Sequence, residues 1–352
     1  MRTFKGFIIK CVLFLVPFFV LAGIYFYDDP FKVLREYKKY DNDPIFLNED
    51  YIGWKTYKNF RDSLHFDSFI LGNSCTMAFL TSDWEKYLNG SKAIRLYGTA
   101  ERLAAIHRKV MTLDKEEEHI ANVLLIVDAT LLREYQLSTG YMHLLPPEVS
   151  GMNKFKFQSQ FAQEFFNPKF LVPYMDYRVC RRYRNYMRGI VNPDKNIRNV
   201  VTNDLWNPRE HEIEQLGEHY WEKHKKRFRP RPGEERVHPP VLMKPQIKLL
   251  SEIAKVFQDH HTKYKIIISP EYKQIRLNPA DVKQLKEIFG AENVYDFSGI
   301  NKYTNNIRNY YEGSHYRPCL GRQLLDSVYS KFFQLNSKRK FRQLAALIYG
   351  TP

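Results

Sequence analysis

The feature that most constrains the fold is a set of short apolar runs that recur along the chain and end at turn residues. The strongest covers residues 122–129 and reads NVLLIVDA. An unbroken apolar run of this length is typical of a strand that is buried on both faces, as in a parallel sheet. Four similar runs are centred near residues 70, 95, 267 and 295. Helical segments separate the runs, so the pattern predicts an α/β fold with a five-stranded parallel sheet.

The expected helices follow from the spacing of apolar residues and from their caps. The helix over residues 281–289 follows Asn278 and Pro279, a cap residue and a proline suited to the first helical turn. The other segments with helical character cover residues 82–88, 100–111, 244–258 and 320–335.

A candidate nucleophile lies where the first strand ends. Residues 67–77 read DSFILGNSCTM, and Gly72 and Asn73 place Ser74 on a tight turn. Ligands bind at this edge of an open α/β sheet. A helix starting near Met77 would direct free backbone N–H groups to the same place, which suits a serine with an oxyanion hole. Taken alone, the tripeptide is better explained as ordinary turn chemistry.

The second half of the candidate site follows the fifth strand. The spacing of Glu312 and His315 lets both side chains point into one cleft from a turn. Glu312 can then orient His315, and His315 can take the proton of Ser74. Taken alone, His315 is better explained as a helix-capping residue on a surface loop. The two motifs at opposite ends of a five-stranded α/β pattern favour a catalytic triad, although the Gly-x-Ser-x-Gly elbow is absent.

Composition limits the partners and cofactors. The chain has 352 residues, a hydrophobic fraction of 44%, a formal charge of +15 and a pI near 9.4. It can therefore form one large core with an insertion, and it attracts anions such as phospholipid head groups, acidic glycans or nucleic acid. No zinc-type cysteine spacing or nucleic-acid-binding motif is present, so we expect no nucleic-acid partner and no metal. No Gly-rich phosphate loop opens a helix, so we expect no cofactor.

The N-terminus predicts a membrane anchor. Arg2, Lys5 and Lys10 precede an apolar run over residues 11–27, which approaches the length that spans a bilayer. A cleaved signal peptide is the alternative, because Leu21-Ala22-Gly23 offers small residues. We expect residues 1–28 to be an uncleaved transmembrane helix with a cytoplasmic N-terminus. The rest of the chain would then lie outside the cytoplasm, in the periplasm.

The remaining chain divides by composition. We expect a linker and lead-in over residues 29–64, an α/β domain over 65–335, and a basic tail over 336–352. The domain is interrupted at about 140–245 by a segment rich in aromatic and basic residues, including CRRYRNYMR at 180–188 and HKKRFRPR at 224–231. These runs suit an anionic polymer or lipid head groups. A solvated helix face followed by a Pro-rich loop explains them equally well.

Together the motifs resemble the SGNH (GDSL-like) hydrolase superfamily over roughly residues 65–335, excluding the insertion. The resemblance rests on Gly72-Asn73-Ser74, on Gly98 after the second strand, and on Glu312 with His315. The segment SHYRPCLG at 314–321 is similar to the late block of the membrane-anchored branch. That branch includes the alginate O-acetylation and teichoic-acid D-alanylation proteins.

The resemblance implies a flavodoxin-like, three-layer α/β/α fold with Ser74 as nucleophile, His315 as base and Glu312 as the third triad member. It further implies an oxyanion hole formed by the backbone amides of Ser74 and Gly98. Four residues beside these motifs are candidate substrate-binding residues: Asn73, Asp128, Tyr316 and Arg317. The implied partners are the lipid bilayer, a cell-surface glycan and a multi-spanning membrane O-acyltransferase.

Two departures from the family pattern bear on activity. Asn73 replaces the usual Asp before the serine, and Asp128 stands where the family has an Asn that donates to the oxyanion. An ionised carboxylate cannot donate, and losing one donor typically costs about a hundredfold in rate. The function that the resemblance implies is nevertheless a membrane-anchored serine acyltransferase or esterase that acts on O-acyl groups of a surface polysaccharide. The alternative is an inactive module that binds the glycan or the membrane partner.

Two cysteines flank the catalytic motifs. Cys75 follows the candidate nucleophile and Cys319 follows the candidate base. An oxidising compartment would permit a disulfide between them. Two small buried hydrophobic residues are the alternative, because Cβ geometry is not readable from sequence.

Overall fold

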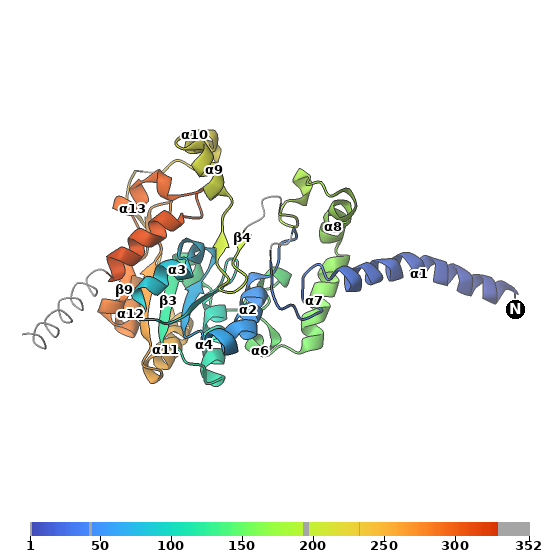
Figure 1. The fold of residues 1–352 in the computed structure, drawn as a ribbon, viewed down its shortest axis with the longest axis horizontal. Helices are drawn as coiled ribbons and strands as arrows, with labels where there is room; N and C mark the ends of the chain where they lie inside the picture. The colour runs from blue at the N-terminus through green and yellow to red at the C-terminus, as the bar shows by residue number, and fades with distance from the viewer. Residues whose placement is uncertain (1, 42–43, 193–196, 232, 330–352) are drawn as a thin grey trace, which may run out of the picture.

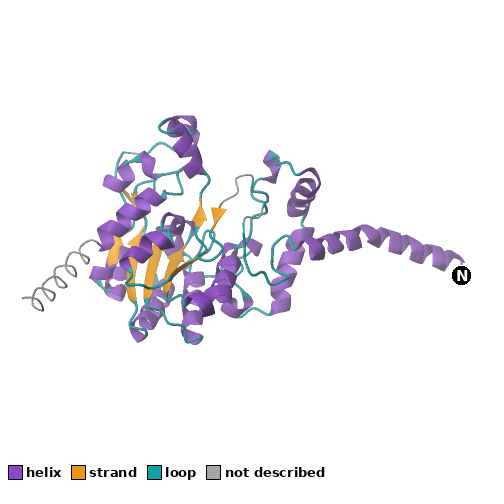
Figure 2. Ribbon diagram, in the orientation of Figure 1, coloured by secondary structure: helices purple, strands orange, loops and turns teal. Residues whose placement is uncertain are grey.

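The computed structural model describes residues 2–41, 44–192, 197–231 and 233–329. Its centre is a five-stranded sheet in which all strands run parallel. In spatial order the strands are β2 (Ala93–Tyr97), β1 (Ser68–Gly72), β3 (Asn122–Val127), β7 (Lys263–Ile268) and β9 (Val294–Asp296). The α/β class and the five predicted parallel strands are thus confirmed (Figures 1 and 2).

The strand order places the candidate nucleophile at a switch point. The chain moves from β1 outward to β2, returns to β3 on the other side of β1, and continues to β7 and β9. The direction of winding reverses between β1 and β3, and open α/β sheets bind their ligands at the carboxyl ends of the strands at such a point. Gly72, the last residue of β1, pairs with Ile126 near the end of β3. The segments after these two strands therefore begin side by side.

Helices cover both faces of the sheet. One face, with Leu71 and Leu125, packs against α2 (Glu49–Leu64), α4 (Leu103–Lys115), α11 (Lys244–Asp259) and α12 (Pro279–Phe289). The other face, with Ile70 and Leu124, packs against α3 (Thr81–Trp84) and the helix over 318–329. Alternate strand residues thus enter two separate apolar layers, as the period of two requires. Asn278 caps α12 and Pro279 is its first residue, as predicted.

Helix α2 lies in the segment that the sequence predicts to be a linker and lead-in. Asn48 caps it by accepting from the Tyr51 amide, and its first two turns are buried on several sides, including Ile52, Trp54 and Tyr57. A helix that is buried on most of its circumference lacks the single apolar stripe by which amphipathic helices are recognised. For this reason the sequence pattern does not reveal it.

The insertion after β3 consists of short helices and one small hairpin. These helices are α5 (Ala129–Arg133), α6 (Pro147–Ser150), α7 (Lys154–Phe166), α8 (Pro168–Cys180), α9 (Arg209–Leu216) and α10 (His219–Lys223). The short strands are β4 (Ile197–Arg198) with β5 (Leu205–Trp206), and β6 (Arg236–Val237) with β8 (Ile275–Arg276). A last short helix, α13 (Lys302–Asn305), precedes the second half of the candidate site. In Figure 1, α9 and α10 lie together near α13, whereas α7 and α8 lie at the base of α1.

Helix α1 (Arg2–Asp28) projects away from the sheet (Figure 1). Its end is packed, because Tyr25 is buried with its ring 5.0 Å from that of Phe165. Before that contact, Phe14 and Phe19 are exposed. Among the residues that the structure describes, none of the helices is both long and apolar enough to cross a membrane. The predicted basic tail at 336–352 lies outside the described residues.

Candidate active site

Ser74 is held by a turn that only glycine can begin. Gly72 ends β1 with φ of +143°, and a Cβ at this position would collide with the carbonyl oxygen of Ile126. Asn73 then caps a 3-10 helix, Ser74–Ala78, by accepting from the Cys75 amide at 2.9 Å. The helix therefore begins at the candidate nucleophile itself, slightly earlier than predicted near Met77.

Glu312 and His315 lie on a tight loop that the backbone closes. Tyr310 and Tyr316 form an antiparallel bridge at its base, and the Tyr311 amide donates to the His315 carbonyl at 3.1 Å. The loop leads directly into the helix over 318–329. Its tip is thereby fixed against the carboxyl edge of the sheet.

The three predicted residues form a continuous chain of hydrogen bonds. His315 Nε2 lies 2.9 Å from Ser74 Oγ, and His315 Nδ1 lies 2.5 Å from Glu312 Oε1. The second carboxylate oxygen, Oε2, accepts from the Ser314 amide at 3.1 Å. With the proton on Nδ1, the imidazole presents a lone pair to the serine hydroxyl. This is the arrangement of a nucleophile, a general base and an orienting acid.

Glu312 remains a carboxylate despite partial burial. Burial alone would raise its pKa, but the hydrogen bond and the charge of His315 outweigh burial and lower the pKa below the usual value. The guanidinium of Arg209, with Nη1 4.0 Å from Glu312 Oε1, acts in the same direction. An ionised Glu312 can hold the imidazole and stabilise the imidazolium that forms during reaction.

The expected oxyanion hole is only partly present. Ser74 is the first residue of its helix, where backbone N–H groups have no intrahelical partner. The Gly98 amide, in contrast, donates to Glu101 Oε2 at 2.5 Å, and Glu101 is buried with Lys109 and Asp50. In this structure the buried carboxyl group of Glu101 already accepts the Gly98 N–H, so that the role of Gly98 as an oxyanion donor stays a prediction.

Asp128 and Asn73 also serve the scaffold. Asp128 caps α5 by accepting from the amides of Thr130 and Leu131 at 2.9 and 2.8 Å, and its other oxygen accepts from Asn73 Nδ2 at 2.5 Å. Both side chains are largely buried. Asp128 therefore holds the turn that carries the nucleophile, and its expected contact with substrate stays a prediction.

Tyr316 and Arg317 are likewise engaged within the protein. Tyr316 is buried, with its hydroxyl 3.3 Å from Ser269 Oγ. Arg317 donates to both carboxylate oxygens of Glu210, at 3.0 and 2.8 Å, and to the Arg308 carbonyl at 3.0 Å. Both residues lie beside the base, as the sequence places them, and their polar groups have internal partners. Substrate binding by Tyr316 and Arg317 stays a prediction.

Two functional-site neighbours were not anticipated. Glu271 follows β7 at the same edge of the sheet, and burial together with the charge of Asp128 raises its pKa to about 7. Arg209 comes from α9, in the insertion. The position of Glu271 just after a predicted strand is a usable sequence signal. Nothing in the sequence indicates that α9 returns to the site.

The cysteines that flank the site are free thiols, as is Cys180. Burial, and then the charge of Asp128, raise the pKa of the Cys75 thiol. Its Sγ lies 3.9 Å from the Ser314 carbonyl oxygen. A thiol that is held protonated reacts slowly, so Cys75 acts as a small packed side chain.

We expect both Cys75 and Cys319 to be alkylated when the protein is denatured without reductant. Intact-protein and peptide mass spectrometry would count the labels, and a reduced sample would serve as the control. A peptide pair that carries label only after reduction would contradict the structure.

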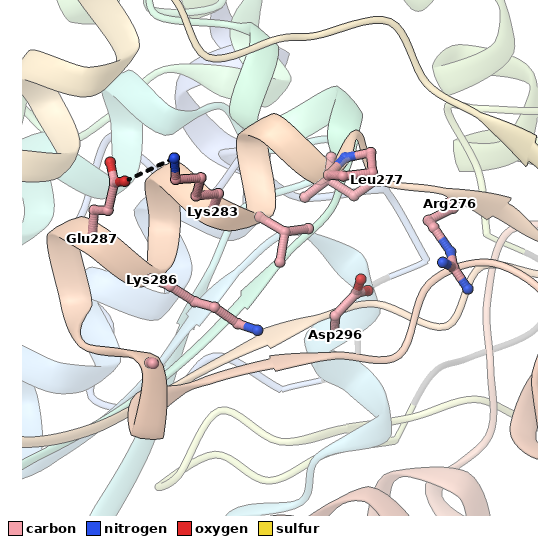
Figure 3. A pocket seen from close by; sticks show the side chains of 9 residues that line it. Arg276, Leu277, Lys283, Lys286, Glu287 and Asp296 are labelled. Atoms are coloured by element: carbon pink, nitrogen blue, oxygen red, sulfur yellow. Dashed lines mark ion pairs between the residues drawn. The ribbon is translucent and has the colours of Figure 1, made fainter.

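A pocket of about 550 Å³ lies away from the triad, along α12 and β9. Figure 3 shows Arg276, Lys286 and Asp296 around it, with Lys283 paired to Glu287 at 3.8 Å. Its lining includes no residue of the triad loop or of the Ser74 turn. The pocket therefore adds nothing to the chemistry of Ser74.

No protein-family model and no curated protein matches this chain. The functional argument is therefore carried by the sheet topology and by the hydrogen-bonded serine, histidine and glutamate.

Proposed function

We propose that this protein is an SGNH-like serine acyltransferase or esterase, associated with the membrane, that acts on O-acyl groups of a cell-surface polysaccharide. The observation that carries the proposal is the chain from Glu312 through His315 to Ser74 Oγ, with distances of 2.5 and 2.9 Å. A serine hydroxyl at a strand end, with a base and an orienting acid, is suited to acyl transfer through a covalent ester.

The reaction proceeds in two halves. Ser74 Oγ attacks the carbonyl carbon of the donor ester while its proton passes to His315 Nε2. The tetrahedral intermediate collapses, the donor alkoxide leaves with the proton from His315, and the acyl group remains on Ser74. An acceptor hydroxyl then gives its proton to His315 and attacks this ester, and Ser74 leaves with that proton. Transfer and hydrolysis differ only in whether a sugar hydroxyl or water is the acceptor.

The negative charge of each intermediate needs donors beside Ser74. The Ser74 amide is one, at the start of its helix. The resembling family has Asp beside the serine and Asn after the third strand, whereas here Asn73 and Asp128 stand the other way round and bind each other. The Asn73 amide nitrogen carries a second hydrogen. We propose it as the further donor, because it lies on the residue adjacent to the nucleophile.

The occupied Gly98 amide favours a second candidate function. If no further donor acts, the site is too poor for catalysis, and the protein is an inactive SGNH-like module that binds a glycan or a membrane O-acyltransferase. Covalent labelling of Ser74 separates the two.

The basic run at 224–231 supports an acidic glycan as the acceptor. It lies against the triad loop, because the Gly313 amide donates to the Arg227 carbonyl at 3.4 Å and the Tyr272 hydroxyl donates to the Arg229 carbonyl at 3.1 Å. Four of its cations are exposed and form no ion pair within the described part of the chain: Lys225, Lys226, Arg227 and Arg229. An anionic polymer would therefore meet positive charge without an ion-pair partner beside the loop that carries Glu312 and His315.

The earlier basic run at 180–188 follows α8, which packs at the opposite end of the molecule. Arg178 pairs with Asp28 at 2.5 Å, at the end of α1. Basic residues at the foot of an exposed apolar helix suit anionic lipid head groups. The two basic runs thus suit two different partners.

The acyl donor must come from a partner. The chain has no recognisable motif for acyl-CoA or a nucleotide, and one anchor cannot carry an activated acyl group across a bilayer. We propose that a multi-spanning membrane O-acyltransferase supplies it and that α1 holds the domain beside this partner at the membrane, on the periplasmic side.

Removal of residues 1–20 is expected to release the protein from membranes. The deletion takes away the exposed apolar part of α1 but keeps Tyr25, which is buried against α7. The full chain should remain in membranes washed with alkaline carbonate. The shortened chain should be soluble and folded, with a circular dichroism spectrum that has lost only the signal of the deleted helical residues. A periplasm-dependent reporter fused after Pro352 should be active. Full-length protein in the soluble fraction, or a reporter active only in the cytoplasm, would overturn this localisation.

Transfer and hydrolysis can be separated directly. The shortened protein is incubated with an activated acyl ester and a panel of acidic and neutral surface glycans, and acylated glycan is quantified against free acid. We expect acylated acidic glycan. Free acid alone across the panel would leave an esterase, and neither product would leave only the binding module.

A further inference from the structure

A carboxylate from the insertion joins the two arms of the triad loop. Glu210 Oε1 accepts from the Tyr311 hydroxyl at 2.6 Å and from Arg317 Nε at 3.0 Å, while Oε2 accepts from Arg317 Nη2 at 2.8 Å. Tyr311 immediately precedes Glu312, and Arg317 comes two residues after His315. The two catalytic residues are therefore enclosed between the two partners of one carboxylate.

Within the loop region itself, two side-chain hydrogen bonds also join these arms: His315 Nδ1 with Glu312 Oε1 at 2.5 Å, and Arg317 Nη1 with the Arg308 carbonyl at 3.0 Å. The backbone of the loop is closed by the Tyr311 amide donating to the His315 carbonyl and by the Arg317 amide donating to the Asn309 carbonyl, at 3.1 and 2.8 Å. These bonds fix the base of the loop. Glu210 adds a charged, bidentate hydrogen-bonded contact from a separate helix. Such a contact fixes the relative orientation of the two side chains in addition to stabilising their pairing.

The environment of Glu210 keeps this contact strong. Its side chain and that of Arg317 are only 23% and 16% exposed. Burial opposes the charge of Glu210, but the hydrogen bonds from Arg317 and Tyr311 outweigh it and lower the pKa of the carboxyl. The carboxylate is thus ionised at neutral pH and little screened by solvent.

The next helix completes the support. The Tyr220 hydroxyl donates to the Tyr311 carbonyl at 2.9 Å, and Trp221 Nε1 donates to the Tyr310 carbonyl at 3.1 Å. Both donors come from α10. Helices α9 and α10 therefore make three hydrogen bonds to Tyr310 and Tyr311, the two residues that lead to Glu312.

We propose that Glu210 is a positioning residue for the triad, and that α9 of the insertion sets the geometry of Glu312 and His315 against Ser74. The inference rests on the proposed function, because it assumes that the triad reacts. In physical terms, loss of the link lets the two arms move separately. A displacement of about 1 Å at the reacting atoms can reduce rate roughly a hundredfold.

The test is the rate at which a fluorophosphonate labels Ser74 in the full chain. Glu210→Gln keeps the size of the side chain but removes its charge, and Tyr311→Phe removes one hydrogen bond while keeping the buried ring. Glu214→Gln, an exposed position on the same helix, is the matched control. All proteins are assayed well below their unfolding midpoints, and the maximal labelling rate is separated from the affinity for the probe. Proton NMR follows the far-downfield resonance of the Nδ1–H between His315 and Glu312.

We expect Glu210→Gln to lower the maximal labelling rate by about 10- to 100-fold with little change in probe affinity, and to weaken or broaden the Nδ1–H resonance. Tyr311→Phe should give a smaller loss in the same direction, and Glu214→Gln none. Wild-type labelling rates in both Glu210→Gln and Tyr311→Phe would overturn the positioning role while leaving the triad standing. No labelling of the wild type would instead refute the proposed function.

Discussion

Replacement of Ser74 by alanine is expected to reduce ester turnover by roughly 10⁴- to 10⁶-fold. The expected loss is large because Ser74 Oγ is the atom that becomes acylated, and no other hydroxyl among the described residues hydrogen-bonds to His315. The unfolding midpoint should change little, since Ser74 is partly exposed and its hydroxyl hydrogen-bonds to no other residue in the described part of the chain. The measurement is steady-state hydrolysis of a small activated ester, with unfolding followed by circular dichroism.

The same assay tests whether the residues act as a unit. His315→Ala should lower the turnover rate nearly as much as Ser74→Ala does. The double variant should be hardly slower than either single variant, because Ser74 does not react without its general base. Ser63→Ala, at an exposed serine on α2, is the control for the substitution itself. Additive losses, or turnover above a tenth of the wild-type rate in either single variant, would contradict a triad.

Replacement of Lys109 by methionine is expected to destabilise the fold by about 3–5 kcal/mol. The ammonium group lies 2.7 Å from Asp50 Oδ1 and 2.6 Å from Glu101 Oε1, and these three side chains are at most 3% exposed. Removing the cation leaves two buried carboxyl groups without their counter-charge. Lys115→Met, at an exposed site on the same helix, should change stability by less than about 0.5 kcal/mol. Urea unfolding at pH 7 provides the comparison.

The same cluster predicts the direction of a pH dependence. Burial raises the pKa of Glu101 to about 8, against the attraction of Lys109. A carboxyl whose folded pKa exceeds its unfolded value contributes stability that is complete below about pH 4.5 and is lost as the pH rises through 8. Glu101→Gln should therefore flatten the fall in stability between these limits. An unchanged slope in Glu101→Gln, or a Lys109→Met variant as stable as the wild type, would contradict this assignment.

The sheet could be predicted from sequence because each strand contains a short, largely apolar run with a turn at its end. Residues 122–127 are buried at every position, and the same holds for β1 and β2. Helix α2 could not be found, because its burial on several sides removes the periodic stripe. The insertion was not divided into helices from its sequence, because most of its helices are short. In α7, however, the buried Phe157, Phe161 and Phe165 are spaced four residues apart, which is a usable helical signal.

The triad could be predicted, but its surroundings could not. Ser74, Glu312 and His315 lie on segments that the strand pattern brings to one edge, so motif and topology suffice. The roles of Gly98, Asp128 and Arg317 depend on which neighbouring side chain forms a hydrogen bond with the polar group of each. Glu101, Asn73 and Glu210 do so in this structure. Such competition depends on side-chain positions across the fold, which spacing along the chain does not encode.

The most direct test of an activated serine is covalent labelling of the full chain by a fluorophosphonate, with the modified residue located by peptide mass spectrometry. Formation of the adduct needs a deprotonated nucleophile and donors for a developing oxyanion, so it reports on the whole site. We expect one phosphonyl adduct on Ser74, lost in Ser74→Ala and in His315→Ala and retained in Ser63→Ala. An unmodified Ser74 in folded wild-type protein, or labelling that persists without His315, would contradict the account.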